Sequence, residues 1–255
     1  VIIRYYIAAA FFLVVGATLA GFVTAAMFDA DPPAWLAEAR DRLTVAHALA
    51  GVAGWVGLTM GGTLVTLGPT AMRTRMDPLA VSFATSALPL WVAALLVAGT
   101  GAVAGSMRVT SVGLLVVVGA AALGVGVPLV RVALTKGPAE YGAWSLMLGA
   151  AWILVAGAGA SLRAFEAADA TGLRSAFLAW MPILGAAGLG QLFVGALTYL
   201  MPVVIGGGPS AVRVGVGVLE AGAPIREAAR NVAAVLALAV ASLGGTSAER
   251  LTIAA

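Results

Sequence analysis

The stretch VTSVGLLVVVGAAALGVGVPLV, residues 109–130, contains no charged side chain and is long enough to cross a lipid bilayer as a helix. A helix rises about 1.5 Å per residue, so about 20 apolar residues span a hydrocarbon core of about 30 Å. Apolar residues occupy both odd and even positions of the stretch, whereas a strand of a membrane barrel alternates apolar and polar residues. Residues 109–130 therefore predict a transmembrane helix.

Six further charge-free runs surround this one along the chain, and together they predict an all-α, polytopic transmembrane helix bundle of about seven spans. We expect the spans near 5–28, 43–70, 79–104, 109–131, 140–163, 175–205 and 226–246. The sixth span should end near residue 205, because Gly206-Gly207-Gly208-Pro209 follows it. We interpret residues 1–255 as a single transmembrane domain and as a fragment of a longer chain.

The composition excludes soluble classes of protein. Of the 255 residues, 62% are hydrophobic and only 10% are charged, whereas a soluble domain averages about 25% charged residues. The 14 Lys and Arg residues are scattered between apolar runs, a pattern that orients membrane helices and does not form a nucleic-acid-binding surface. We therefore expect a multi-pass protein of the plasma membrane, with the lipid bilayer as a partner and no nucleic acid.

The distribution of charge predicts an orientation. A cytoplasmic amino terminus places slightly more basic residues on the inside than on the outside, as the positive-inside rule requires. It also separates two groups of side chains across the membrane: Arg73, Arg75, Arg131 and Lys136 on the inside, and Asp29, Asp31 and Glu38 on the outside. Segment 32–42 is then expected to be a short interfacial helix on the outside. Arg226, Arg230 and Asn231 open the seventh span at the inner face, where the Arg–Glu spacing predicts ordinary helix-end anchoring.

The chain has a single histidine, His47, and no cysteine, so thiolate metal sites and iron–sulfur clusters are excluded. His47 opens the second predicted span, and Gly51 and Gly54 share its helix face. In a structural interpretation, the imidazole bonds a neighbouring carbonyl and the glycines admit another helix. In a functional one, His47 is a metal ligand to a planar cofactor such as haem, and the glycines make room for the macrocycle.

The sixth span carries a second candidate site. Gln191 and Thr198 fall near one helix face, and Tyr199 lies beside it. Their amide, hydroxyl and phenol groups can bind a quinone carbonyl or a polar headgroup, or they can pair with neighbouring helices. No carboxylate or lysine lies in the middle of a predicted span, which argues against a proton pump or an ion-coupled transporter.

Three segments of the chain resemble known membrane proteins. AHALAGVAGWVGLTMGGTLVTLGP, residues 46–69, is similar to a helix of proteins related to haem–copper oxidase subunit I, in which the pattern A-H-x-H-x-x-x-x-G-W-V-G-L opens a helix at the outer face. Residues 128–157 and 190–213 resemble actinobacterial membrane proteins described as copper oxidases. Many of those proteins carry a cupredoxin, nitrite-reductase-like region after the membrane helices. The resemblance covers most of residues 43–213.

The resemblance implies an integral-membrane domain of an oxidoreductase-like protein, which anchors an extracytoplasmic copper domain and passes electrons to it. The implied partners are that cupredoxin-type domain or other membrane subunits. The implied cofactor here is b-type haem at His47, with copper only in a domain not present in these residues. The pattern's second histidine is Leu49 in this chain, so neither bis-histidine haem nor a complete haem–copper centre can form from the one histidine.

The residues themselves are also compatible with two other functions. One is a cofactor-free structural anchor or scaffold, and the other is a small-molecule or metal permease. No catalytic residue is assigned, and the sequence leaves open whether this part of the protein is an enzyme.

Overall fold

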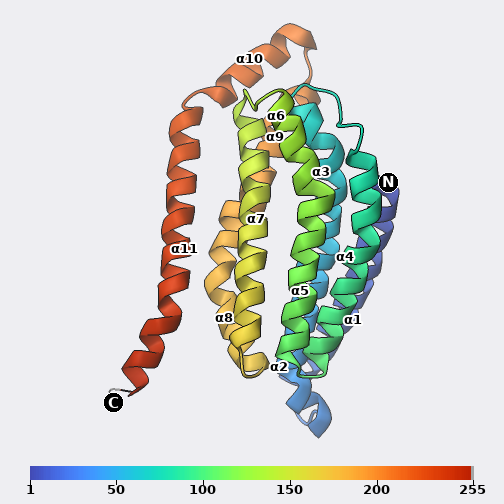
Figure 1. Cartoon of the computed structure of the whole chain (residues 1–255), viewed down its shortest axis with the longest axis vertical. Coiled ribbons are helices and arrows are strands. Elements are labelled where there is room, and N and C mark those ends of the chain that lie inside the picture. Colours follow the sequence, from blue (N-terminus) through green and yellow to red (C-terminus); the bar gives the residue numbers. More distant parts are fainter. Residues whose placement is uncertain (254–255) are drawn as a thin grey trace. The chain divides into compact units, whose positions relative to one another are not determined.

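A computed structural model describes the backbone of residues 1–253 and the side chains of residues 1–242. All regular elements in this part of the chain are helices (Figure 1). The contacts divide the chain into two compact units. Unit 1 comprises Val1–Val65, Pro78–Pro128 and Gly157–Leu178, and unit 2 comprises Thr66–Asp77, Leu129–Ala156 and Ala179–Ala255.

Six helical segments have the length and hydropathy of membrane spans, so the chain is a multi-pass membrane protein. They are Ile2–Phe28, Ala34–Ala71, Ala80–Val103, Met107–Thr135, Tyr141–Glu166 and Ala170–Ile205. These segments contain the predicted spans 5–28, 43–70, 109–131 and 175–205, and the sixth ends at residue 205 as predicted. The predicted span 79–104 is one residue longer at each end than the observed helix, and 140–163 begins one residue before its helix. The seventh predicted span, 226–246, falls in α11 (Ala223–Ile253) and runs past residue 242, so its end lies outside the described side chains. The orientation stays a prediction.

Three of the six spans contain a π-helical stretch. The second span consists of α2 (Ala34–Ala48), η1 (Leu49–Val56) and α3 (Gly57–Ala71). The fourth consists of α5 (Met107–Ala121), η2 (Ala122–Gly126) and α6 (Val127–Thr135), and the sixth of α8 (Ala170–Pro182), η3 (Ile183–Gly190) and α9 (Gln191–Ile205). The spans α1 (Ile2–Phe28), α4 (Ala80–Val103) and α7 (Tyr141–Glu166) are α-helical throughout, and α10 (Gly208–Glu220) joins α9 to α11 (Figure 1).

Segment 32–42 is not a separate interfacial helix, which corrects the sequence prediction. Its residues from Ala34 onward form the first turns of one helix of 38 residues, because no glycine or proline lies between Ala34 and Ala50 to end it. At 1.5 Å per residue, such a helix is about 57 Å long and extends beyond the hydrocarbon core. Its Asp41 accepts hydrogen bonds from Thr171 and Arg174 of α8 at 2.8 and 2.9 Å.

Unit 1 is held by close backbone contact and by hydrogen bonds between helices. A Cβ atom added at Gly113 of α5 would lie 2.6 Å from the backbone nitrogen of Ala98 on α4. Tyr5 of α1 is fully buried, and its hydroxyl donates to the carbonyl oxygen of Ala84 at 3.0 Å. Since lipid is as apolar as a leucine side chain, close packing of small residues and interhelical hydrogen bonds stabilise such helices.

Unit 2 has the same type of packing between α7 and α9. A Cβ atom at Gly149 would lie 2.8 Å from the backbone nitrogen of Leu192, and one at Gly195 would lie 2.8 Å from the carbonyl oxygen of Gly142. A buried apolar cluster adds residues of α8, η3 and α11. Its members are Ala156, Trp180, Ile183, Ala187, Ala234 and Ala241. These contacts bring α11 into the same unit as α7 and α9.

Candidate functional site

His47 hydrogen-bonds to a neighbouring helix. Its Nδ1 lies 2.9 Å from the carbonyl oxygen of Gly16 on α1, so a protonated Nδ1 donates this bond. The side chain is half-buried. This contact is the one that the structural interpretation of His47 requires.

The glycines beside His47 have two different environments. A Cβ atom at Gly54 would lie 2.6 Å from Cβ of Phe12, so α1 packs directly on this glycine. A Cβ atom at Gly51 would meet nothing within 4 Å. The room that we assigned to a macrocycle is therefore filled by Phe12 at Gly54 and is open at Gly51. Haem binding at His47 stays a prediction.

The two glycines provide a matched test of this packing. We expect Gly54→Ala to lower the free energy of unfolding by about 1–3 kcal/mol, because the added methyl overpacks Phe12. Gly51→Ala, in the same π-helical stretch, should leave stability unchanged or slightly raised. Thermal unfolding followed by circular dichroism in detergent measures both. Equal effects of the two substitutions would mean that α1 does not cover Gly54.

The three residues of the second predicted site separate in the structure. Gln191 and Thr198 do lie on the buried face of α9, as the helical spacing predicted. The Thr198 hydroxyl donates to the carbonyl oxygen of Val194 in its own helix, at 2.8 Å. Thr198 and the half-buried Tyr199 line a cavity of only about 50 Å³, far below the roughly 300 Å³ of the smallest common ligand sites.

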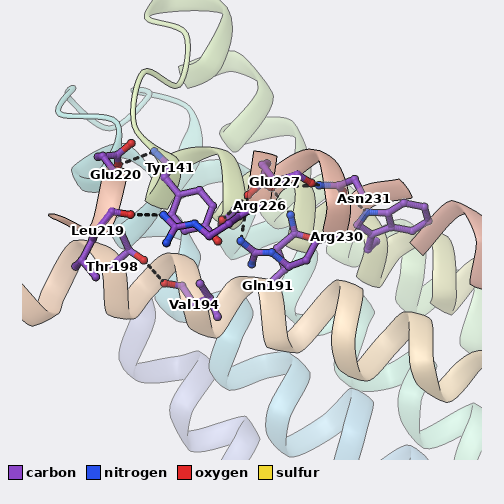
Figure 2. Close-up of polar contacts among 12 residues, drawn as sticks. Tyr141, Gln191, Val194, Thr198, Leu219, Glu220, Arg226, Glu227, Arg230 and Asn231 are labelled. Carbon is purple, nitrogen blue, oxygen red and sulfur yellow. Dashed lines mark hydrogen bonds and ion pairs between the residues drawn. The ribbon is translucent and has the colours of Figure 1, made fainter. Parts of the chain in front are cut away.

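Gln191 is directed instead at a carboxylate, Glu227 of α11, as Figure 2 shows. Nε2 of Gln191 donates to Oε1 of Glu227, and Oγ of Ser145 on α7 donates to Oε2 at 2.9 Å. Gln191 and Ser145 are fully buried, and the Glu227 side chain is only 14% exposed. One carboxylate therefore connects α7, α9 and α11.

Two residues of the next turn of α11 complete the network around Glu227. The amide nitrogen of Asn231 donates to Oε1 of Glu227 at 3.2 Å, and its amide oxygen accepts a hydrogen bond from the indole nitrogen of Trp152 at 2.7 Å. Nη2 of Arg230 lies 3.4 Å from Oε2. Four side chains thus donate to this carboxylate, and such pairing is what makes a buried charge tolerable in a low-dielectric medium.

Cationic and anionic groups meet at the start of α7. The guanidinium carbons of Arg226 and Arg230 lie 4.6 and 4.9 Å from the centroid of the Tyr141 ring, within the range of cation–π contacts. Oε1 of Glu220, the last residue of α10, accepts a hydrogen bond from the backbone nitrogen of Tyr141 at 2.8 Å. Burial, and then the charge of Glu140, raise the pKa of Glu220 above its ordinary value, against the opposing effect of Arg226.

A cavity of about 780 Å³ adjoins the Glu227 network. One wall belongs to the start of α7, with the large side chains Tyr141, Trp144, Leu148, Trp152 and Val155. The other wall belongs to Glu220 and the start of α11, with Ala223, Pro224, Glu227, Ala228 and Asn231. A mainly apolar and aromatic lining with a few polar groups is the usual composition of a small-molecule site.

Glu227 is not among the site residues predicted from the sequence, where the Arg–Glu spacing at the start of α11 indicated only an ordinary helix-end anchor. In the structure the Asn231 amide is bonded on both sides within unit 2, to Trp152 and to Glu227. The sequence did contain a pattern that indicates a polar cluster, because residues 227, 230 and 231 share one helix face at spacings of three and four. The sequence does not show, however, that this face meets Gln191 and Ser145.

Comparisons of the chain with models of known protein families, with curated proteins and with solved structures found no match.

Proposed function

We propose that the cavity between α7 and α11 binds a hydrophobic small molecule with a polar ring, and that isoprenoid quinones and quinols are the class. The observation that carries this proposal is a buried carboxylate with four donors, Glu227, in the wall of an aromatic cavity. Burying an ionisable group among membrane helices is costly, so such groups usually serve ligands or ions.

The size and lining of the cavity suit this class of ligand. Its volume of about 780 Å³ lies within the roughly 300–1,000 Å³ of cofactor sites. Trp144 and Trp152 offer flat faces on which a ring packs. Leu148 and Val155 extend the wall along α7, where an isoprenoid tail finds apolar contacts.

The polar groups suit both redox states of the ring. A quinol hydroxyl that displaces Arg230, the most distant donor at 3.4 Å, can donate to the carboxylate of Glu227. The phenol of Tyr141 can donate to a quinone carbonyl. A quinone site also fits the oxidoreductase-like membrane domain that the resemblance implies, because quinols carry electrons within membranes. The extracytoplasmic copper domain and the plasma-membrane location belong to the same proposal.

A cofactor-free scaffold is the second candidate, and the saturation of Glu227 favours it. The two carboxylate oxygens already hold donors from Ser145, Gln191 and Asn231, with Arg230 close by. In this case the network only joins three helices, and lipid chains fill the cavity.

Tryptophan fluorescence in lipid nanodiscs distinguishes the two candidates. Decylubiquinone, whose ring quenches tryptophan, should give saturable quenching, and Trp144→Phe should remove much of the saturable part. Trp55→Phe is the matched control, because Trp55 is exposed and belongs to unit 1. Ala151→Phe, which narrows the cavity, should raise the apparent Kd at least tenfold. Quenching that is linear and equal in all four proteins would contradict quinone binding and favour the scaffold.

A further inference from the structure

α10 begins at Gly208, directly after a membrane span. The span ends at Ile205, and Gly206, Gly207 and Gly208 then have φ angles of 78°, 91° and 84°. These positive values are accessible to glycine without strain, so the chain turns sharply and α10 crosses to α11 at one end of unit 2 (Figure 1). None of its residues is buried. The helix therefore lies where the span reaches the surface of the bilayer.

The two sides of α10 have different surroundings. On one side, the half-buried Val212 and Val216 line a small cavity together with Thr198 of α9. A Cβ atom at Gly215, at the edge of this side, would lie 3.2 Å from Cβ of Pro202, so the side packs on α9. On another side, Ala211, Val214 and Val218 share a face at spacings of three and four. Val214 and Val218 are 67% and 68% exposed. We call Ala211, Val214 and Val218 the outer strip.

We infer that the outer strip lies in the lipid bilayer, at the boundary between headgroups and acyl chains, which makes α10 a membrane-surface helix. Exposed apolar residues also flank the strip along the chain, because Val204 and Ile205 precede it and Ile225 follows it, each more than three-quarters exposed. Val204 and Ile205 end a helix with the length and hydropathy of a membrane span, so lipid is the partner that we assign to this surface.

The charges of α10 agree with this partner. Arg213, which lies off the outer strip, is its one charged residue before Glu220. A basic side chain beside an apolar strip is typical of helices that lie on anionic bilayers. Glu220 and the carbonyl oxygen of Leu219 hold the last turn to Tyr141 and Arg226, so α10 has a defined position from which the strip can enter the lipid.

Site-directed labelling tests the inference, because the chain contains no cysteine. Val214→Cys and Val218→Cys, each labelled with NBD in nanodiscs containing anionic lipid, should be quenched by lipids that carry a doxyl group near the headgroup. Both labels should be at least threefold less sensitive to aqueous iodide than a label on Arg213→Cys, the matched control on the same helix. A label on Val212→Cys, on the packed side, should be shielded from both quenchers.

Three outcomes would overturn the inference. Equal quenching by iodide at residues 213, 214 and 218 would place the outer strip in water. Shielding of residues 214 and 218 from both quenchers would mean that a second copy or another protein covers the strip. Access of either quencher to residue 212 would mean that α10 does not pack on α9 as described.

Discussion

Replacing Glu227 with alanine should lower the free energy of unfolding by about 3–5 kcal/mol, the range for removing one partner of a buried ion pair. The substitution leaves the guanidinium of Arg230 without its carboxylate. It also leaves the buried Ser145 hydroxyl and Gln191 amide without their acceptors, and each unsatisfied buried group costs about 1–3 kcal/mol. Equilibrium unfolding in mixed micelles with increasing SDS measures the change.

A matched carboxylate is available for comparison. Glu166 pairs with Arg163 at 2.8 Å, also three residues apart, but the Glu166 side chain is 62% exposed. Glu166→Ala should therefore cost no more than about 1 kcal/mol. Glu227→Gln keeps the shape of the side chain and part of its hydrogen bonding. Its loss in the free energy of unfolding should therefore lie between those of Glu227→Ala and Glu166→Ala. If Glu227→Ala cost no more than Glu166→Ala, the network would not hold α7, α9 and α11 together.

Gly113→Ala should lower the free energy of unfolding by about 2–3 kcal/mol. This value is near the upper end of the destabilisation caused by adding a methyl group to a well-packed core. The added methyl would lie 2.6 Å from the backbone nitrogen and 2.8 Å from Cα of Ala98. Backbone atoms cannot rotate away as a side-chain tip can, so α4 and α5 must separate along their contact.

Gly119→Ala on the same helix is the control for the change in helix propensity. A Cβ atom there would meet nothing within 4 Å, so this variant should be neutral or more stable by up to about 1 kcal/mol. The same SDS unfolding experiment compares the two. Similar stabilities of the two variants would show that α4 and α5 do not approach each other at Gly113.

Much of the fold could be predicted because hydropathy is a local property. Each of the first six predicted spans coincides with an observed helix, and none extends more than one residue beyond it. The helical spacing in α9 also predicted its buried face, with Gln191 and Thr198. The predicted grouping of Arg73, Arg131 and Lys136 agrees with unit 2, where Lys136 donates to the carbonyl oxygen of Arg73 and Arg131 pairs with Asp77.

The candidate site could be predicted only in part, because its residues come from three helices far apart in the chain. Gln191 stood out as a lone amide in an apolar run. Glu227 did not, since charged residues near a helix end usually reach the headgroups. Its partners Ser145 and Gln191 lie 82 and 36 residues away, and nothing local indicates that their faces meet.

The sequence by itself determined that this chain crosses a membrane several times as helices, and where most of those helices begin and end. The tertiary structure alone decided which faces meet: Gly54 against Phe12 while Gly51 stays uncovered, His47 on the carbonyl of Gly16, and Glu227 on Gln191. The physical reason is that burial in lipid depends on each segment's own composition. The pairing of helices depends instead on close packing and directional hydrogen bonds, and a chain with 33 glycines offers many small-residue faces on which helices can pack.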